Sequence, residues 1–262
     1  MRYWFRLLVS IFLLIATKFA LAQALGAVMM HGKWSSGIPW HIVVSNSIKD
    51  EGWPVIELTM PWSANRLYDA SYDEALRQVA AAVAELRSKG VRRVVVGGHS
   101  FGANAAIAYA ASGGDLDAIL AMAPGHSPGS NYRKGTTKET VDQAKQLVAE
   151  GKGAEKISFV DTNQGKQRGL TARADVFLSY FDPNGLGDMP TSMAKIAKPI
   201  PLLWLIGTND PLYPAGQAFA YNRAPAHPLS GYVVVAADHA NTPSVGREEV
   251  IKWLKLIAAQ PE

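Results

Sequence analysis

The sequence predicts one α/β domain in which a mostly parallel sheet of about six strands is covered by helices. Short β-branched runs alternate with longer stretches of helical period from residue 25 onward, which is the order that builds such a sheet. The chain has 262 residues, of which 48% are hydrophobic and 18% are charged, and this is enough for one sizeable buried core. No internal repeat interrupts the alternation.

The first 22 residues differ in character from the rest of the chain. Two arginines flank an aromatic start, an apolar run follows over 7–16, and the small-x-small pattern Ala-Leu-Ala occupies 20–22. This pattern is typical of a signal peptide, and the alternative is an uncleaved membrane anchor, because the apolar stretch approaches spanning length. We expect a signal peptide at 1–22, one folded domain at 23–262 and an exported protein, periplasmic or secreted, without stable membrane association after cleavage.

Charge and cysteine content argue against several function classes. The formal charge is +4, but the first 22 residues hold three basic residues and no acid, which leaves 23 basic and 22 acidic residues. A balance so near zero, without a basic run, argues against nucleic acid as a partner. The absence of cysteine excludes a thiol nucleophile, a disulfide framework and a cysteine zinc site.

The first predicted elements are strands over 25–30 and 55–58, with a helix over 39–50 between them. The next helix has the clearest start signal in the chain, because Ser71 and Glu74 fit a capping box, in which each side chain satisfies the other's backbone donor. Its apolar side chains fall on one face before Lys89-Gly90 ends it. They are Tyr72, Leu76, Val79, Val83 and Leu86.

Strands and helices continue to alternate in the remainder of the chain. The predicted strands cover 91–96, 118–123, 202–206 and 232–236. The predicted helices cover 103–111, which is rich in alanine, and 246–257, which carries an apolar face for the sheet. Residues 125–200 are mixed in polar character and include a predicted helix over 138–150, so we expect a cap inserted before the penultimate strand.

Two serines stand in a Gly-x-Ser-x-Gly sequence, and physical chemistry separates them. A serine nucleophile needs a base, an acid that orients the base, and donors for the oxyanion, one of which is the backbone N–H of the following residue. Phe101 can supply that N–H after Ser100, whereas Pro128 cannot after Ser127. Ser100 also joins a predicted strand to a predicted helix, whereas Ser127 precedes a predicted loop over 129–131. Ser100 is therefore the candidate nucleophile.

The acid and the base are expected later in the chain, each just past the C-terminal end of a strand. Asp210 and His239 meet that condition, and His239 is the only one of six histidines that follows a late strand. Asp238 is adjacent to His239 and would have difficulty bonding its neighbour's imidazole, so we interpret it as a turn residue. The predicted catalytic set is Ser100, His239 and Asp210.

The residues after the first two strands are candidates for the oxyanion hole and the substrate pocket. A backbone N–H of Lys33 or Trp34 is expected to face that of Phe101. Side chains near the same edge of the sheet would line a substrate pocket, or alternatively pack or solvate a loop. The candidate substrate contacts are His31, Gly32, His99, Trp62, Arg66 and Tyr68.

Gly98-His99-Ser100-Phe101-Gly102, Asp210, His239 and His31-Gly32, in this order on these strands, resemble the α/β-hydrolase superfamily, and in particular its bacterial esterases and lipases. The resemblance covers nearly all of the mature chain. It implies hydrolysis of a small-molecule carboxylic ester through an acyl-enzyme, with no metal and no organic cofactor. Members often begin with two additional strands for which this chain has no room, which suggests a reduced sheet.

Other functions remain open at this point. The same residues would serve a thioesterase or a small peptidase, and a fold relative can bind ligands without catalysis. The cap mixes lysine and arginine with acids around a few apolar clusters, which favours small or medium polar esters over long-chain triglycerides. The sequence does not predict an oligomeric state.

Overall fold

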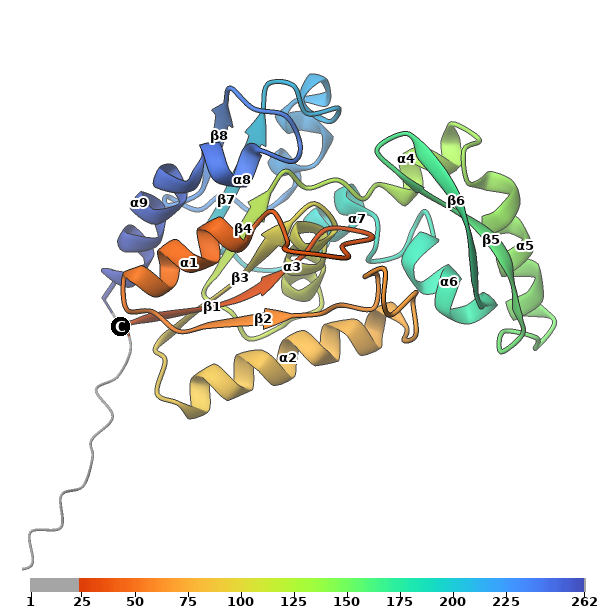
Figure 1. The fold of residues 1–262 in the computed structure, drawn as a ribbon, viewed down its shortest axis with the longest axis horizontal. Helices are drawn as coiled ribbons and strands as arrows, with labels where there is room; N and C mark the ends of the chain where they lie inside the picture. Colours follow the sequence, from red (N-terminus) through yellow and green to blue (C-terminus); the bar gives the residue numbers. More distant parts are fainter. Residues whose placement is uncertain (1–23, 262) are drawn as a thin grey trace, which may run out of the picture.

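The sheet holds six parallel strands, as the sequence predicts. A computed structural model describes residues 24–261, so the predicted export signal at 1–22 lies outside the described residues. The strand order is β2-β1-β3-β4-β7-β8, and every neighbouring pair is parallel (Figure 1). The strands are β1 (Leu25–Met30), β2 (Val55–Leu58), β3 (Arg93–His99), β4 (Ala118–Met122), β7 (Leu202–Gly207) and β8 (Gly231–Val235).

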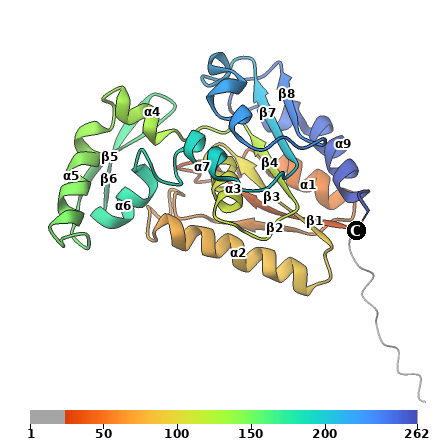
Figure 2. The same ribbon diagram turned by 180° about the vertical axis from the view of Figure 1, so that it is seen from behind.

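Helices cover both faces of the sheet. On the face seen in Figure 1 lie α1 (Ile42–Asp50), α9 (Arg247–Ala258) and the short α8 (Thr242–Val245). On the other face, seen in Figure 2, lie α2 (Tyr72–Ser88) and α3 (Phe101–Ala111). All six residues of β1 are buried, as expected for a central strand covered on both sides. Its alternate side chains enter two separate apolar cores.

Helix α2 begins at the predicted cap, although only half of the predicted capping box forms. The backbone N–H of Glu74 donates to Ser71 Oγ at 3.2 Å. The carboxylate of Glu74 is instead paired with Arg77 at 2.6 Å, because the exposed first turn brings the two charges together. The five apolar side chains predicted to share one face of this helix are all buried.

A cap is inserted between β4 and β7, as predicted. It consists of α4 (Pro128–Arg133), α5 (Lys138–Ala149), β5 (Lys156–Asn163), β6 (Lys166–Arg173), α6 (Ala174–Phe181) and α7 (Met189–Lys195). The antiparallel hairpin of β5 and β6 packs with α5 and α6 beyond one end of the main sheet (Figure 1). Sequence patterning missed this hairpin. Its two turn residues, Gln164 and Gly165, both have the positive φ that tight hairpin turns require.

The cap and the sheet share one apolar core. Tyr180 and Phe181 of α6 are fully buried and belong to the same cluster as Phe101 and Trp62. Tyr180 also donates its hydroxyl to the carbonyl oxygen of Ala70 at 2.8 Å, in the segment that precedes α2. The cap is therefore a packed part of the domain.

The remaining differences from the predicted fold are small. Element boundaries agree with the predicted ones to within three residues. The connection from β7 to β8 contains three short 3₁₀ turns at Tyr213–Ala215, Gln217–Phe219 and Tyr221–Arg223. No helix within residues 24–261 is both long and apolar enough to cross a membrane.

Candidate active site

Ser100 occupies a sharp turn between β3 and α3. Its φ of 57° and ψ of −116° lie in a region that non-glycine residues rarely adopt, a form of strain that functional sites often contain. A β-carbon at Gly98 or Gly102 would collide with the carbonyl oxygen of Met30 at the end of β1. Only glycine fits at these two positions, and their close packing on β1 holds the turn in place.

A hydrogen-bond chain joins Ser100 to His239 and Asp210. Nε2 of His239 lies 2.9 Å from Ser100 Oγ, and its Nδ1 lies 2.6 Å from Asp210 Oδ2. Because the carboxylate of Asp210 can only accept, Nδ1 of the neutral ring carries the proton and donates it in this hydrogen bond. Nε2 is then free to accept the serine proton. The other oxygen of Asp210 accepts from the backbone N–H of Leu212 at 2.7 Å. All three side chains are buried.

The two other acids near these segments have different partners. Asp238 is exposed and accepts from the backbone N–H of Asn241 at 2.7 Å. Asp182 in the cap lies 3.6 Å from Lys145. Of the acids in residues 24–261, Asp210 is the one whose carboxylate bonds His239.

The sequence predicts the backbone N–H of Lys33 or of Trp34 as the second donor for the oxyanion. In the structure, of these two only the N–H of Lys33 is without an acceptor among the described residues. The backbone N–H of Trp34 donates to the carbonyl oxygen of Trp62 at 2.9 Å, so the expectation for Trp34 is wrong. Trp34 adopts a left-handed conformation, with a φ of 60°, and its amide is taken up by the segment after β2. The backbone N–H groups of Lys33 and Phe101 have no protein acceptor within the described residues, and both residues line the cavity that contains Ser100.

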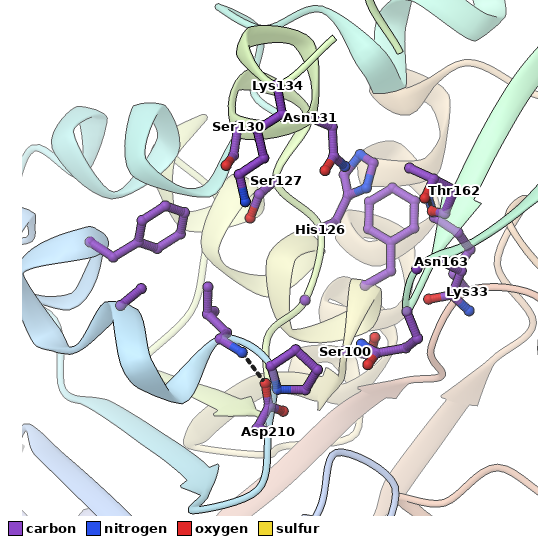
Figure 3. A pocket seen from close by; sticks show the side chains of 18 residues that line it. Lys33, Ser100, His126, Ser127, Ser130, Asn131, Lys134, Thr162, Asn163 and Asp210 are labelled. Carbon is purple, nitrogen blue, oxygen red and sulfur yellow. Dashed lines mark hydrogen bonds between the residues drawn. The ribbon is translucent and has the colours of Figure 1, made fainter. Parts of the chain in front are cut away.

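That cavity has a volume of about 480 Å³, which is the size of a small-ligand pocket (Figure 3). Ser100 and Asp210 lie at its base, and residues of α4 lie opposite them (Figure 3). One wall is polar and comes from the cap: Ser127, Ser130, Asn131 and Lys134, with 162–165 at the hairpin turn. The other wall follows β7 and is largely apolar: Pro211, Leu212, Ala215 and Phe219.

The six predicted substrate contacts do not line this cavity. Trp62 is fully buried and donates its indole N–H to the carbonyl oxygen of His31 at 2.9 Å. Arg66 donates to the carbonyl oxygen of Thr59 at 2.7 Å. Leu67 and Tyr68 both adopt positive φ, which folds this segment back onto the core. Gly32 and His99 border a separate, smaller cavity of about 260 Å³. The prediction of these contacts, His31, Gly32, His99, Trp62, Arg66 and Tyr68, is wrong for the cavity at Ser100.

Three buried histidines support the site as neutral groups. Burial lowers the pKa of His99 to about 3, and its Nε2 donates to the carbonyl oxygen of His239 at 2.8 Å. Burial also lowers the pKa of His31, whose Nε2 accepts from the backbone N–H of Met60 at 2.9 Å. Burial holds the pKa of His126 well below its usual value. These rings position loops without carrying charge.

Ser127 lies at the start of a helix rather than in a loop. Residues 129–131 belong to α4, so the predicted loop is wrong. Pro128 supplies a preset φ at the first helical position, and the carboxylate of Asp188 accepts from the backbone N–H of Gly129 at 3.0 Å. That acid lies 59 residues away in the chain, so local sequence could not reveal it. Ser127 lines the cavity, but its side chain has no bond to His239.

Sequence reasoning also missed the buried ion pair of Lys33 and Asp161. The ammonium of Lys33 lies 2.8 Å from the carboxylate of Asp161 in β5, and both side chains are almost completely buried. The only available signal was the alternation along β5, which polar residues obscure. Within residues 24–261, no group of three or more histidine, cysteine or acidic side chains is arranged to hold a metal ion.

Comparisons with known proteins identify the family of the chain and its fold. The profile of the Alpha/beta hydrolase family matches residues 27–253. No curated protein matches the chain. A structure described for LipS and LipT, two metagenome-derived lipolytic enzymes, is 12% identical with a TM-score of 0.59, covering 91% of this chain and 95% of that chain. Est1E from Butyrivibrio proteoclasticus is 15% identical with a TM-score of 0.57, over 93% and 92%. The siderophore hydrolase EstB from Aspergillus fumigatus is 13% identical with a TM-score of 0.59, over 91% and 92%. At these identities the three structures show a common fold.

Proposed function

This chain belongs to the alpha/beta hydrolase family, and from that premise we propose that it is a serine hydrolase that cleaves carboxylic esters through an acyl-enzyme. The observation that carries the proposal is the chain of hydrogen bonds from Ser100 Oγ through His239 to Asp210. A serine needs this arrangement to attack a carbonyl at neutral pH.

Each step of the proposed reaction has a group to perform it. Ser100 Oγ attacks the ester carbonyl while Nε2 of His239 takes the serine proton. The backbone N–H groups of Phe101 and Lys33 donate to the developing oxyanion. His239 then returns the proton to the departing alcohol, which leaves the acyl group on Ser100. Water, activated by the same imidazole, releases the acid and restores the serine.

A fluorophosphonate probe tests this proposal directly. We expect the folded protein to be labelled on the peptide that contains Ser100, because a probe of this kind reacts only with an activated serine. Peptide mass mapping identifies the site, and unfolded protein serves as the control. Absence of labelling on well-folded protein would favour a non-catalytic binding protein of the same fold. A panel of matched ester, thioester and peptide substrates then separates the leaving groups.

The lining of the cavity supports a small or medium polar ester as the substrate. Lys134 is exposed at the rim, and within the described residues it forms no ion pair, so the polar wall offers a free positive charge. We propose that Lys134 attracts a carboxylate at the far end of the substrate. A contact of this exposed kind contributes about 0.2–1 kcal/mol.

Lys134→Gln is therefore expected to raise KM about two- to fivefold for an ester with a terminal carboxylate, and to leave KM unchanged for a neutral ester of the same length. Arg133→Gln is the matched control, because Arg133 is the adjacent exposed cation but does not line the cavity. Steady-state kinetics of both variants on both esters measures the difference. Equal effects of the two substitutions would rule out a specific contact with Lys134.

A further inference from the structure

Asp161 joins the cap hairpin to the segments that follow β1 and β2. Its side chain is fully buried in β5, and its carboxylate accepts three hydrogen bonds from those segments. Lys33 Nζ donates at 2.8 Å, Trp34 Nε1 donates at 2.6 Å and the hydroxyl of Tyr68 donates at 2.9 Å. We call these four side chains the Asp161 network.

The ammonium of Lys33 has almost no contact with solvent that could hydrate its charge. Its side chain is 2% exposed, and Nζ lies 4.8 Å from the ring centroid of Phe181 and 5.3 Å from that of Phe101. It also donates to the carbonyl oxygen of Thr162 at 3.0 Å, in the same strand as Asp161. Burial lowers the pKa of Lys33, and the neighbouring carboxylate opposes this effect. The charge of Lys33 therefore depends on Asp161.

Stability alone does not account for such a network. A buried ion pair loses the hydration of both charges, and well-packed apolar side chains of similar volume are often at least as stabilising. The residues of the network differ from an ordinary buried ion pair in their position, because the backbone of Lys33 lies at the cavity. Lys33 lines the cavity and has a backbone N–H without a protein acceptor in the described residues, and the amide of Trp34, the next residue, is bonded to Trp62.

We infer that Asp161 is a positioning residue, which holds the backbone N–H of Lys33 in place for the oxyanion and so couples the cap to the chemical step. This inference rests on the proposed serine hydrolase function. The side chain of Lys33 is anchored to the cap through the ion pair, and the backbone of His31 is anchored through its carbonyl oxygen, which accepts from the indole N–H of Trp62 at 2.9 Å. The Gly32–Lys33 peptide, which carries the N–H, lies between these two anchors and cannot shift unless one of them gives way. Asp161 also lies directly before 162–165, which form part of the cavity wall.

Asp161→Asn tests the inference, because asparagine keeps an acceptor for Trp34 and Tyr68 but removes the charge that holds Lys33. We expect kcat for a neutral ester, expressed per serine titrated with the fluorophosphonate probe, to fall at least tenfold, with KM changed by less than about twofold. This is a part of the loss of about 10²–10³ seen when an oxyanion donor is removed altogether. Expressing kcat per titrated serine removes any effect of a smaller folded fraction.

Asp142→Asn is the matched control. Asp142 is also an acid of the cap that accepts from a lysine and a tyrosine, Lys138 at 2.5 Å and Tyr132 at 2.6 Å, but its side chain is 42% exposed and bonds no member of the Asp161 network. We expect its kcat per serine to equal that of the parent protein. If Asp161→Asn gives too little folded protein, Tyr68→Phe removes one donor without leaving a lone charge, and a kcat about two- to threefold lower is expected from the loss of one network bond.

The possible results separate this inference from the function on which it rests. Unchanged kcat per titrated serine in Asp161→Asn, or in Tyr68→Phe where that variant is used, would overturn the positioning role while the labelled parent protein still supports the serine hydrolase. A parent protein that is not labelled would overturn both. A fall in kcat without a matching rise in KM, absent from Asp142→Asn, supports the inference.

Discussion

Replacement of Ser100 with alanine is expected to lower kcat by about 10⁵- to 10⁶-fold, the scale of loss when a triad nucleophile is removed. The hydroxyl bonded to His239 is the only candidate attacking group in the proposed reaction. The fold should persist, because the turn at this position is fixed by Gly98 and Gly102 against β1. Ester hydrolysis at high enzyme concentration, with thermal unfolding followed by circular dichroism, measures both effects.

Ser127→Ala is the control for this experiment. Ser127 has the same Gly-His-Ser-x-Gly sequence and lines the same cavity, but it lacks the bond to His239. We expect Ser127→Ala to retain kcat within severalfold, with any change appearing mainly in KM. Loss of turnover in Ser127→Ala with normal activity in Ser100→Ala would reverse the assignment of the nucleophile.

Asp210→Asn is expected to lower kcat by about 10⁴-fold, less than the loss of the serine, because the nucleophile and the oxyanion donors remain. Asparagine presents an N–H₂ group where the carboxylate now accepts from Nδ1 of His239. The ring is then pushed toward the tautomer that protonates Nε2, which cannot accept the serine proton. Steady-state kinetics at neutral pH provides the measurement.

The controls are Asp182→Asn and Asp238→Asn, since these are the other acids considered for the site. Asp182 pairs with Lys145, and Asp238 bonds Asn241, so neither substitution should change kcat by more than about twofold. Near-normal kcat in Asp210→Asn, combined with a large loss in either control, would move the role of the acid to that residue.

The main sheet was predictable from sequence because its signals are local. The strand before Ser100 and the helix after it follow from a valine run, a glycine-rich turn and a row of alanines, and these lie next to each other in the chain. Asp210 and His239 each follow a strand end, so the parallel arrangement alone brings them toward Ser100. Local patterns and the rule of parallel strands therefore sufficed for this set of residues.

The cap hairpin was not predictable by the same means. Asn-Gly and Asp-Gly are the dipeptides that usually predict a tight hairpin turn, whereas this hairpin turns at Gln164-Gly165. The buried face of β5 consists of Phe159 and Asp161. An aspartate in an alternating pattern predicts a position on the exposed face, so the pattern did not indicate a buried strand. Its burial depends on donors at least 93 positions earlier in the chain, which local sequence does not contain.

The six predicted substrate contacts do not line the cavity, for a related reason. Trp62 and Tyr68 follow a strand end, as pocket residues do, but two successive positive φ angles at Leu67 and Tyr68 turn the segment into the core. Leucine and tyrosine rarely adopt positive φ, so neither residue type predicts such a turn. The cavity is lined instead by the cap, whose internal structure the sequence did not define.

The core shared by the cap and the sheet determines how a substrate reaches Ser100. Swinging the cap away would expose the buried rings of Tyr180 and Phe181 to water, at a cost of about 1.5–3 kcal/mol for each ring. The two rings together, at about 3–6 kcal/mol, would keep an open-lid form below about one molecule in a hundred. Substrates must therefore diffuse in through the exposed rim formed by α4, the hairpin turn and the loop after β7. Turnover of dissolved esters should begin without a lag and without activation at an oil–water interface.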